Sequence, residues 1–449
     1  MTDIRDTERW LDRITGWIVI APKGIYHKWQ TQELPKHARF LWRGARWSAG
    51  AKKRQRWEIN TLTTTEAPAG VLDVFFVNVE GLATKRCQEA LARFVKTHPH
   101  YKVSVDESTF IKGYDAKRAK AAVRLGRGAV CRRILTGFPY PSRPLDAFMQ
   151  FNFLDPNILG FTNYFAFRSR YSIMKTLDLG PRSVKVVKGY RNLEELQESI
   201  EPYSARILKE EALPELPPKT YERRVCGMNE RQQAAYQDLL MDCYHELETV
   251  EGKGTVSAQI VLTQMLRLQQ VVAGHLKTDD GTVISLGKVP RLTDTLSLLE
   301  EVGDDRKVVL WSNFVESCRD LHHYIDEQSP GQAVRYWGEV KEDERLQALD
   351  RFANDPECRF FIGNPATGGT GLDLVSADTV IYYSCSPNLE HRIQSEDRTH
   401  RHGQTSSRML YVDMETPNTV DSRILGLLAT KFDVSSQALG EGWREWLRP

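Results

Sequence analysis

Short apolar runs alternate with amphipathic segments over the first third of the chain. The apolar runs lie at residues 17–20, 71–79, 101–105 and 133–136. Short buried strands that alternate with helices predict a parallel α/β sheet. Ligands bind at the carboxyl ends of the strands in such sheets. We therefore expect a binding edge at the residues that end or follow three of these runs, namely Pro22-Lys23, Asp106-Glu107 and Thr136-Gly137.

The pattern changes near residue 161 and changes back near residue 289. Residues 161–276 have mostly helical spacing, with a proline-rich break at 213–218. Short apolar runs then return at 307–311, 360–363, 379–383 and 409–412. We therefore predict an α/β lobe over residues 1–160, a helical insert over 161–288 and a second α/β lobe over 289–449.

Composition excludes several classes of protein. The 449 residues are 41% hydrophobic and 27% charged, which is typical of a globular chain and not of a disordered one. No apolar run approaches the ~18 residues of a membrane span, and the charged N-terminus lacks the apolar core of a secretory signal. The seven cysteines are scattered without a CxxC pair, which indicates a reducing cytoplasm. Since the net charge is only +2, affinity for a polyanion must come from local patches.

Asp106 and Glu107 form the first candidate site. Two adjacent carboxylates at the end of a strand can divide the work of phosphoryl transfer. One can hold Mg2+ while the other orients or deprotonates the attacking water. The alternative interpretation is a surface turn with two solvated acids.

Two further candidates lie in the last quarter of the chain. Gln394, Arg398 and Arg401 recur at the i, i+4 and i+7 spacing of a helix, so we expect them to share one face. Two guanidinium groups on one face suit a triphosphate, and the alternative is a solvated charged helix. The glycine-rich run 368–373 follows a predicted strand and lets the backbone approach phosphate or sugar, and its alternative is a tight turn.

These features occur in the order found in the Swi/Snf-type ATPases, the double-stranded-DNA translocase branch of helicase superfamily 2. The chain resembles this family, and especially its bacterial and phage members, over nearly its whole length. The similar segments are IVIAPKGIYHKW (18–29), FFVNVEGL (75–82), VDES (105–108), LTGFP (135–139), the linker 189–219, VLWSNF (309–314), NPATGGTGLDL (364–374) and QSEDRTHRHGQT (394–405). The resemblance implies two RecA-like parallel-sheet lobes, the first incomplete, in the cytoplasm of a bacterial or phage-infected cell.

The resemblance also implies roles for single residues, with ATP and Mg2+ as cofactors. Asp106 is expected to coordinate Mg2+, and Glu107 to activate water. Arg398 and Arg401 are the expected arginine fingers, and Gln394 is expected to position them. The expected nucleotide contacts are Gly369, Gly371 and Asp373. The motifs that face DNA in the family include Lys23, Thr136 and Ser312.

The sequence lacks the nucleotide-binding loop of the family. A Walker A loop reads GxxxxGK[ST], and its backbone amides and lysine hold the phosphates. The two Gly-Lys pairs, at 252–253 and 287–288, are followed by Gly254 and Val289 and so lack the hydroxyl residue. We consider three explanations: a second polypeptide supplies the loop, the chain starts late, or the protein has lost ATPase activity.

Two basic stretches are candidate DNA contacts. Residues 36–56 hold eight Lys or Arg and no acid, with Trp42 and Trp47 among them, and residues 112–133 hold eight with one acid. Such patches give salt-dependent, sequence-independent phosphate contacts, and the alternative is a solvated basic surface. The expected contacts in the first patch are Arg43, Lys52, Lys53 and Arg54.

The sequence therefore predicts a DNA-dependent ATPase that moves along double-stranded or branched DNA. The alternative from another class is a non-catalytic DNA-binding or regulatory subunit.

Overall fold

The computed structural model describes residues 2–439, apart from residues 24, 138–142, 179–182, 206, 208, 252–257, 279 and 369–371. The chain forms two compact units. The first holds Met1–Ile173 and Gly189–Ala205, and the second holds Met174–Lys188 and Arg206–Asp433. Gly369 and Gly371, two of the expected nucleotide contacts, lie outside the described residues.

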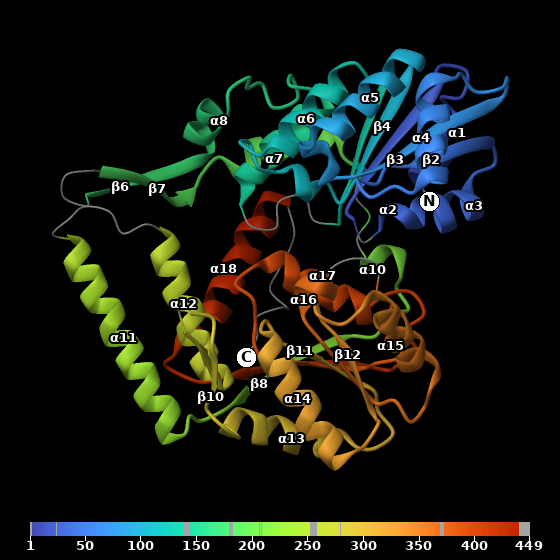
Figure 1. Cartoon of the computed structure of the whole chain (residues 1–449). Helices are drawn as coiled ribbons and strands as arrows, with labels where there is room; N and C mark the ends of the chain where they lie inside the picture. The colour runs from blue at the N-terminus through green and yellow to red at the C-terminus, as the bar shows by residue number, and fades with distance from the viewer. Residues whose placement is uncertain are drawn as a thin grey trace. The chain divides into compact units, whose positions relative to one another are not determined.

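The first unit is built on a five-stranded sheet in the order β2-β3-β1-β4-β5 (Figure 1). Every neighbouring pair is parallel. The strands are β1 Gly16–Ala21, β2 Leu41–Arg46, β3 Val71–Asn78, β4 Tyr101–Asp106 and β5 Cys131–Leu135. Four of them match the apolar runs of the sequence, which confirms the predicted parallel sheet.

Helices cover both faces of this sheet. Alternate residues of β1 enter two different cores, because successive side chains of a strand point to opposite faces. Ile18 and Ile20 pack in the core that includes residues of α4 Lys53–Thr64, α5 Lys85–Thr97, α6 Lys117–Arg127 and α7 Ala147–Leu154. Trp17 and Val19 pack in the core that includes residues of α1 Thr2–Glu8 and α3 Leu34–His37. Burial on both faces explains why β1 reads as a continuous apolar run.

The second unit contains a six-stranded parallel sheet in the order β12-β13-β11-β14-β15-β8. Val309, Trp311 and Phe361 are among its core residues. The strands are β8 Lys219–Val225, β11 Val308–Trp311, β12 Ala333–Tyr336, β13 Phe360–Gly363, β14 Thr379–Tyr382 and β15 Met409–Glu415. The predicted second α/β lobe is therefore confirmed.

The mostly helical reading of residues 161–276 was wrong in part. β6 Ser172–Asp178 and β7 Ser183–Tyr190 form a two-stranded sheet, and β8 belongs to the large sheet of the second unit. β7 contains the run Val184-Lys185-Val186-Val187, whose β-branched residues favour a strand. The helices in this stretch include α11 Glu230–Glu251 and α12 Ala258–Ala273, which pack against each other (Figure 1).

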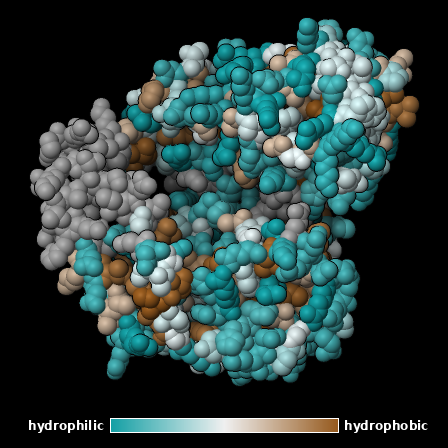
Figure 2. Space-filling view, viewed as in Figure 1, coloured by the Kyte–Doolittle hydropathy of each residue, from teal (hydrophilic) through white to brown (hydrophobic). Residues whose placement is uncertain are grey.

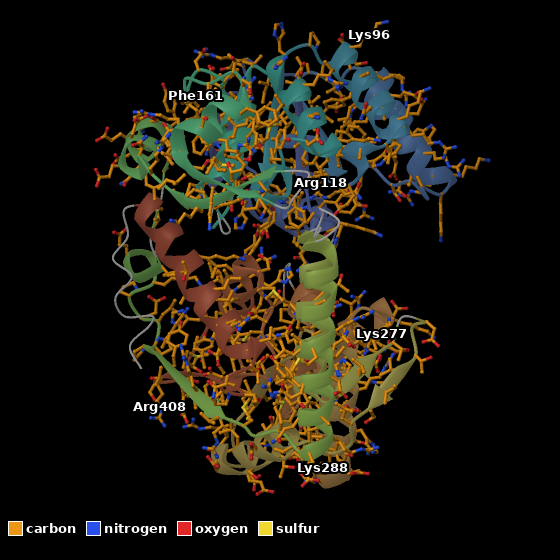
Figure 3. The ribbon with its side chains drawn as sticks, turned by 90° about the vertical axis from the view of Figure 1, so that its left-hand side faces the viewer. Lys96, Arg118, Phe161, Lys277, Lys288 and Arg408 are labelled. Carbon is orange, nitrogen blue, oxygen red and sulfur yellow. The ribbon has the colours of Figure 1, made fainter. Side chains whose placement is uncertain are left out.

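The visible surface is mostly hydrophilic, with apolar residues scattered among polar ones (Figure 2). Exposed cations occur on both units, for example Lys96 on α5 of the first unit and Lys277, Lys288 and Arg408 of the second (Figure 3). Among the described helices, none has the length and apolar character needed to cross a bilayer.

Candidate active site

The carboxyl edge of the first sheet brings together three of the expected segments. In the parallel register Ile20 pairs with Val105, and Asp106 pairs with Leu135. The residues that follow β1, β4 and β5 therefore emerge side by side at one edge, since parallel strands end together. Lys23 is exposed and Thr136 is half-buried there.

Asp106 is half-buried at this edge. The indole Nε1 of Trp29 donates a hydrogen bond of 2.8 Å to its Oδ2, and the backbone N–H of Glu107 donates one of 3.0 Å to its Oδ1. Burial raises the pKa of Asp106, and the nearby carboxylates of Asp3 and Glu33 raise it further, while the two hydrogen bonds act in the opposite direction. The negative charge on Asp106 is therefore costly at neutral pH.

Glu107 has an unusual backbone conformation. Its φ of 49° and ψ of 58° lie in the left-handed region, which side chains other than glycine seldom adopt. Such a conformation costs about 1–3 kcal/mol and persists only where the surroundings impose it. β4 ends at Asp106, so the side-chain direction of Glu107 is set by this turn and not by the alternation of the strand. Strain of this kind is typical of residues that act on a ligand.

The residues at this edge fit a magnesium ion that is bound together with a nucleotide. Mg2+ is usually held by one or two carboxylates, with water and substrate phosphates as its other ligands. Asp106 supplies one such carboxylate, and its excess of nearby negative charge favours a cation. In the described part of the chain, no group of three or more acidic, histidine or cysteine side chains is placed to hold a metal ion.

The second candidate region is α17, which spans Leu389–Thr399. The helix begins at Asn388, whose Oδ1 accepts a hydrogen bond from the N–H of Glu390 at 3.1 Å. Gln394 and Arg398 lie one turn apart on it, as expected. The expectation that Arg401 shares their helix was wrong, because the helix ends at Thr399 with His400 as its C-cap, and a turn follows in which Gly403 has a φ of +97°. Arg401 lies two residues beyond the helix.

The inner face of α17 is held by buried charges. Glu396 accepts hydrogen bonds from Arg392 at 2.8 Å, from Lys219 at 2.9 Å and from the hydroxyl of Tyr221 at 2.8 Å. Arg392 also pairs with Asp413 of β15. Burial works to raise the pKa of Glu396, but Lys219 and Arg392 outweigh it, so the pKa is lowered. The network fixes α17 to β8 and β15.

The end of α17 meets the segment that follows the glycine-rich run. The backbone N–H of Leu374 donates to the carbonyl of Arg398 at 3.0 Å. The guanidinium of Arg401 donates to the carbonyl of Leu372 at 3.2 Å. Asp373, between Leu372 and Leu374, is exposed. The structure therefore brings Arg398, Arg401 and Asp373 close together within the second unit.

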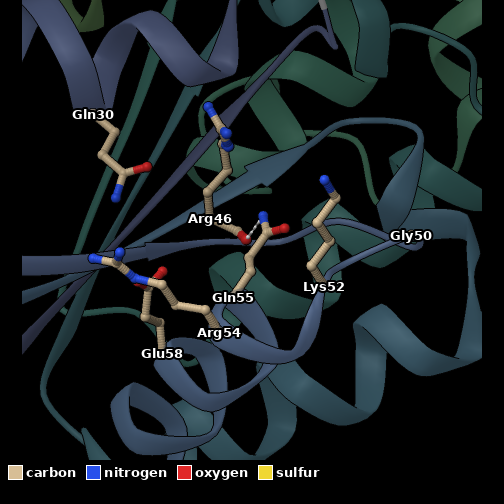
Figure 4. A pocket seen from close by; sticks show the side chains of 7 residues that line it. All are labelled: Gln30, Arg46, Gly50, Lys52, Arg54, Gln55 and Glu58. Atoms are coloured by element: carbon tan, nitrogen blue, oxygen red, sulfur yellow. Dashed lines mark hydrogen bonds and ion pairs between the residues drawn. The ribbon is translucent and has the colours of Figure 1, made fainter.

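A basic cavity of about 390 Å3 lies where β2 ends and α4 begins (Figure 4). Gln55 donates to the carbonyl of Arg46 at 3.0 Å, and Arg54 pairs with Glu58 at 3.1 Å. The cavity has three cations and one acid, which favours an anion such as a phosphate. Its lining residues are Gln30, Arg46, Gly50, Lys52, Arg54, Gln55 and Glu58. Lys53 is exposed beside it, at the first position of α4.

Two expected DNA contacts lie elsewhere. Arg43 donates to both oxygens of Asp73, which also contacts His98. This group lies toward the amino end of β3, opposite the carboxyl edge. Ser312 is fully buried, and its hydroxyl is 3.0 Å from that of Ser384. The geometry gives both residues structural partners and does not favour them as DNA contacts.

Comparison with known families accounts for the order of these elements. The SNF2-related domain matches residues 4–275, more than half of the chain, and the helicase conserved C-terminal domain matches residues 287–403. The chain belongs to the SNF2-related family. Membership confirms the resemblance to Swi/Snf-type ATPases and the RecA-like character of the two lobes. The two acids lie within the SNF2-related match, and Gln394, Arg398 and Arg401 lie within the helicase C-terminal match.

Curated relatives of this SNF2-related chain are much longer than it is. The TATA-binding protein-associated factor mot1 of Schizosaccharomyces pombe is 26% identical over 403 residues, which cover 79% of this chain and 20% of that protein. The DNA annealing helicase and endonuclease ZRANB3 of Mus musculus is 26% identical over 351 residues, which cover 78% of this chain and 31% of that protein. The chain therefore spans about a fifth to a third of their length. Since both come from eukaryotes, they lend no support to the expected bacterial or phage origin.

Among solved structures, the SWI2/SNF2 ATPase core of Sulfolobus solfataricus in complex with dsDNA aligns with a TM-score of 0.41 at 22% identity. The alignment covers 97% of this chain and 86% of that chain.

Sequence reasoning missed several residues that support the candidate site of this SNF2-related chain. Trp29 lies within a motif that was recognised, but its bond to Asp106 depends on the fold. The Arg392 and Glu396 pair has the i, i+4 spacing of a helical ion pair, which was a usable signal. Lys219 gave no such signal, because it lies 177 residues from Glu396 along the chain.

Proposed function

We propose that this SNF2-related chain is part of an ATP- and Mg2+-dependent motor that moves along duplex DNA. The observation that carries the proposal is the presence in one chain of two sets of residues, one in each unit. A strained acid turn follows β4 in the SNF2-related part, and two arginines lie at and just beyond the end of α17 in the helicase C-terminal part. Acids that activate water and arginines that neutralise phosphate charge are the two requirements of phosphoryl transfer.

Each residue has a role that follows from its chemistry. Glu107 accepts a proton from the attacking water, and Asp106 holds the cation. Arg398 and Arg401 stabilise the negative charge that spreads over the transferred phosphoryl group. Gln394 supports these arginines, and Gly369, Gly371 and Asp373 contact the nucleotide. Mg2+, when bound, neutralises the phosphates and polarises the bond that breaks.

We further propose that the phosphate-binding loop comes from a second polypeptide, since the printed sequence has no GxxxxGK[ST] motif. The edge of the first sheet supports this proposal. Among the described strands, β5 pairs only with β4, and all five of its residues are partly exposed. An exposed strand edge is a template for pairing with another chain. A strand that precedes the missing loop would complete the sheet there.

DNA is the proposed substrate, in duplex or branched form. The name of the relative ZRANB3 describes a DNA annealing helicase, and the basic cavity gives this chain a site for a backbone phosphate. Lys52, Lys53 and Arg54 are the proposed contacts at this cavity, together with Lys23 and Thr136 at the carboxyl edge. Remodelling, branch migration and annealing are the proposed outputs. The finer proposal of a bacterial or phage protein rests on motif similarity alone.

The test is ATP hydrolysis by the purified chain, with and without duplex DNA, before and after addition of a polypeptide that carries a GxxxxGK[ST] loop. We expect DNA-stimulated hydrolysis once the loop is present, and a loss of about a thousandfold in Glu107→Gln, because a general base contributes about that much. Arg46→Met should raise the DNA concentration needed for half-maximal stimulation.

The alternative is a non-catalytic DNA-binding or regulatory subunit. Binding of duplex DNA without hydrolysis under any of these conditions would establish the alternative. Hydrolysis by the chain alone that Glu107→Gln abolishes would instead disprove the need for a second polypeptide.

A further inference from the structure

The segment that joins the two units contacts the end of α17. The chain leaves the first unit at Ala205, enters the second unit at Arg206 and reaches β8 at Lys219. Lys209, at the start of α10 Lys209–Ala212, is half-buried. Its Nζ pairs with the carboxylate of Asp397 and donates to the carbonyl of His400 at 2.8 Å.

Two more contacts tie the same segment to α17. The carbonyl of Pro217 lies 2.9 Å from Nε2 of His400, and since a carbonyl can only accept, Nε2 is the donor. Lys219 bonds Glu396 on the inner face of the helix. The connecting segment therefore makes four polar contacts with Glu396–His400, the residues on either side of Arg398.

These contacts satisfy polar groups that the end of a helix leaves without partners. No N–H of the helix donates to its last carbonyls, so these carbonyls need donors from outside the helix. The carbonyl of Arg398 receives the N–H of Leu374, that of Thr399 receives the amide of Gln404 at 3.0 Å, and that of His400 receives Lys209. A cation at this end also complements the helix dipole. Lys209 is therefore one of three donors that define the turn between Arg398 and Arg401.

The charge of Lys209 matters as well as its geometry. Asp397 directly precedes Arg398, and an unpaired carboxylate at that position would attract the guanidinium groups of Arg398 and Arg401. It would also repel a triphosphate. Pairing with Lys209 holds the carboxylate of Asp397 and compensates its charge.

We propose that Lys209 is a positioning residue, which fixes the turn between Arg398 and Arg401 and keeps Asp397 from competing for them. The connecting segment thereby sets the geometry of the two arginines. The effect on hydrolysis rests on the proposed function, whereas the effect on the turn does not.

The first test is amide hydrogen exchange of residues 396–404 in the full chain. In Lys209→Met we expect exchange roughly fivefold to tenfold faster than in the wild type, because a charge-assisted hydrogen bond is lost. Lys341→Met, at an exposed lysine before α15 Glu342–Asn354, is the matched control and should leave these amides unchanged. Asp397→Asn should reproduce the effect, and the double variant should show little more than either single variant.

The second test is ATP hydrolysis with DNA and the added loop. We expect kcat to fall about tenfold in Lys209→Met with KM for ATP nearly unchanged, because the arginines act in the transition state. Lys209→Arg should restore most of the rate. Unchanged exchange in Lys209→Met, or additive effects of Lys209→Met and Asp397→Asn, would overturn the proposal.

Two other results distinguish the effect of Lys209 on the turn from its effect on hydrolysis. Faster exchange with an unchanged kcat would show that the turn does not govern the arginines, and would also overturn the proposal. Absence of hydrolysis in every variant, the wild type included, would count against the proposed function, while the exchange data would still decide whether Lys209 holds the turn.

Discussion

Asp106 is half-buried and Glu396 is buried; both carboxylates lie beside residues proposed to act on ATP, but the charges around them differ in sign. Asp106 has one indole and one backbone amide as donors, with Asp3 and Glu33 nearby, and its pKa is raised by burial. Glu396 has two cations and a phenol as donors, and its pKa is lowered despite burial. The first carboxylate lacks compensating charge, and the second is fully compensated.

This difference indicates what each unit contributes to a reaction. The second unit presents Arg398 near the end of a helix whose buried charges are already paired, and Arg401 in the turn that follows. The first unit keeps a costly negative charge and a strained Glu107 backbone. Binding of a cation with a nucleotide would relieve the electrostatic cost there. The proposed site residues of the first unit therefore lower the stability of the fold, whereas the charge network beside those of the second unit stabilises it.

The comparison predicts a large loss of stability when Glu396 is truncated. Glu396→Ala leaves Arg392 and Lys219 without their shared partner, and breaking a buried ion pair on one side costs about 3–5 kcal/mol. Denaturant unfolding, followed with a probe in the second unit, measures the change. Glu357→Ala, at an exposed acid, is the control and should change the free energy of unfolding by less than about 0.5 kcal/mol. A similar small change in both variants would contradict the view that the network holds α17.

His275 is a buried titratable group of the second unit, and its charged form has no compensating partner strong enough to offset burial. It is 2% exposed in β9 His275–Lys277, and burial lowers its pKa to about 4. The unfolded chain binds a proton near the usual pKa of 6.5 while the folded chain does not, so stability is complete above that pH and falls below it. Between pH 7 and pH 5 the loss from this group should be about 2 kcal/mol.

The measurement is urea unfolding of wild type and His275→Leu at pH 7 and pH 5. We expect the variant to lose about 2 kcal/mol less than the wild type over this range. The other histidines and the carboxylates are the same in both proteins, so the difference between the two losses isolates His275. Equal losses would mean that His275 is protonated in the folded chain.

Much of the fold could be predicted from the sequence, and the failures have physical causes. β1, β3, β4, β11, β13 and β14 are buried on both faces, so their apolar runs stand out. β2 was missed because it is an edge strand, whose residues LWRGAR mix aromatic and basic side chains. β8 was missed because its residues are exposed or half-exposed at the other sheet's edge.

The candidate site shows the same division. Asp106 and Glu107 could be found because a motif places them directly after a buried strand. Arg401 was placed on a helix because its spacing fits one, but spacing does not reveal where a helix is capped. The bonds from Trp29 to Asp106 and from Lys219 to Glu396 join residues 77 and 177 positions apart, and only the packing of the elements brings them together.

Asp106→Asn should have the opposite effect to Glu396→Ala. The amide keeps an acceptor for Trp29 and loses the bond from the N–H of Glu107, but it removes a charge that burial and the neighbouring acids make unfavourable, so the free energy of unfolding should rise at pH 7 by no more than about 1 kcal/mol. The raised pKa also fixes the pH dependence. Since the folded wild type binds its proton at a higher pH than the unfolded chain, its disadvantage exists at neutral pH and disappears as the pH falls through the raised pKa toward 3.8.

Unfolding of the first unit at pH 7 and at low pH, in wild type and Asp106→Asn, measures both effects. The advantage of the variant should shrink as the pH falls, and DNA-stimulated hydrolysis should be lost in the same variant. Asp115→Asn, at an exposed acid whose pKa is lowered by Lys120, is the control and should not stabilise the chain. If Asp106→Asn instead destabilised the first unit at pH 7, the carboxylate would be compensated in the folded chain, and the contrast between the two units would fail. A gain in stability together with a loss of hydrolysis would show that the first unit keeps an unfavourable charge because ligand binding requires it.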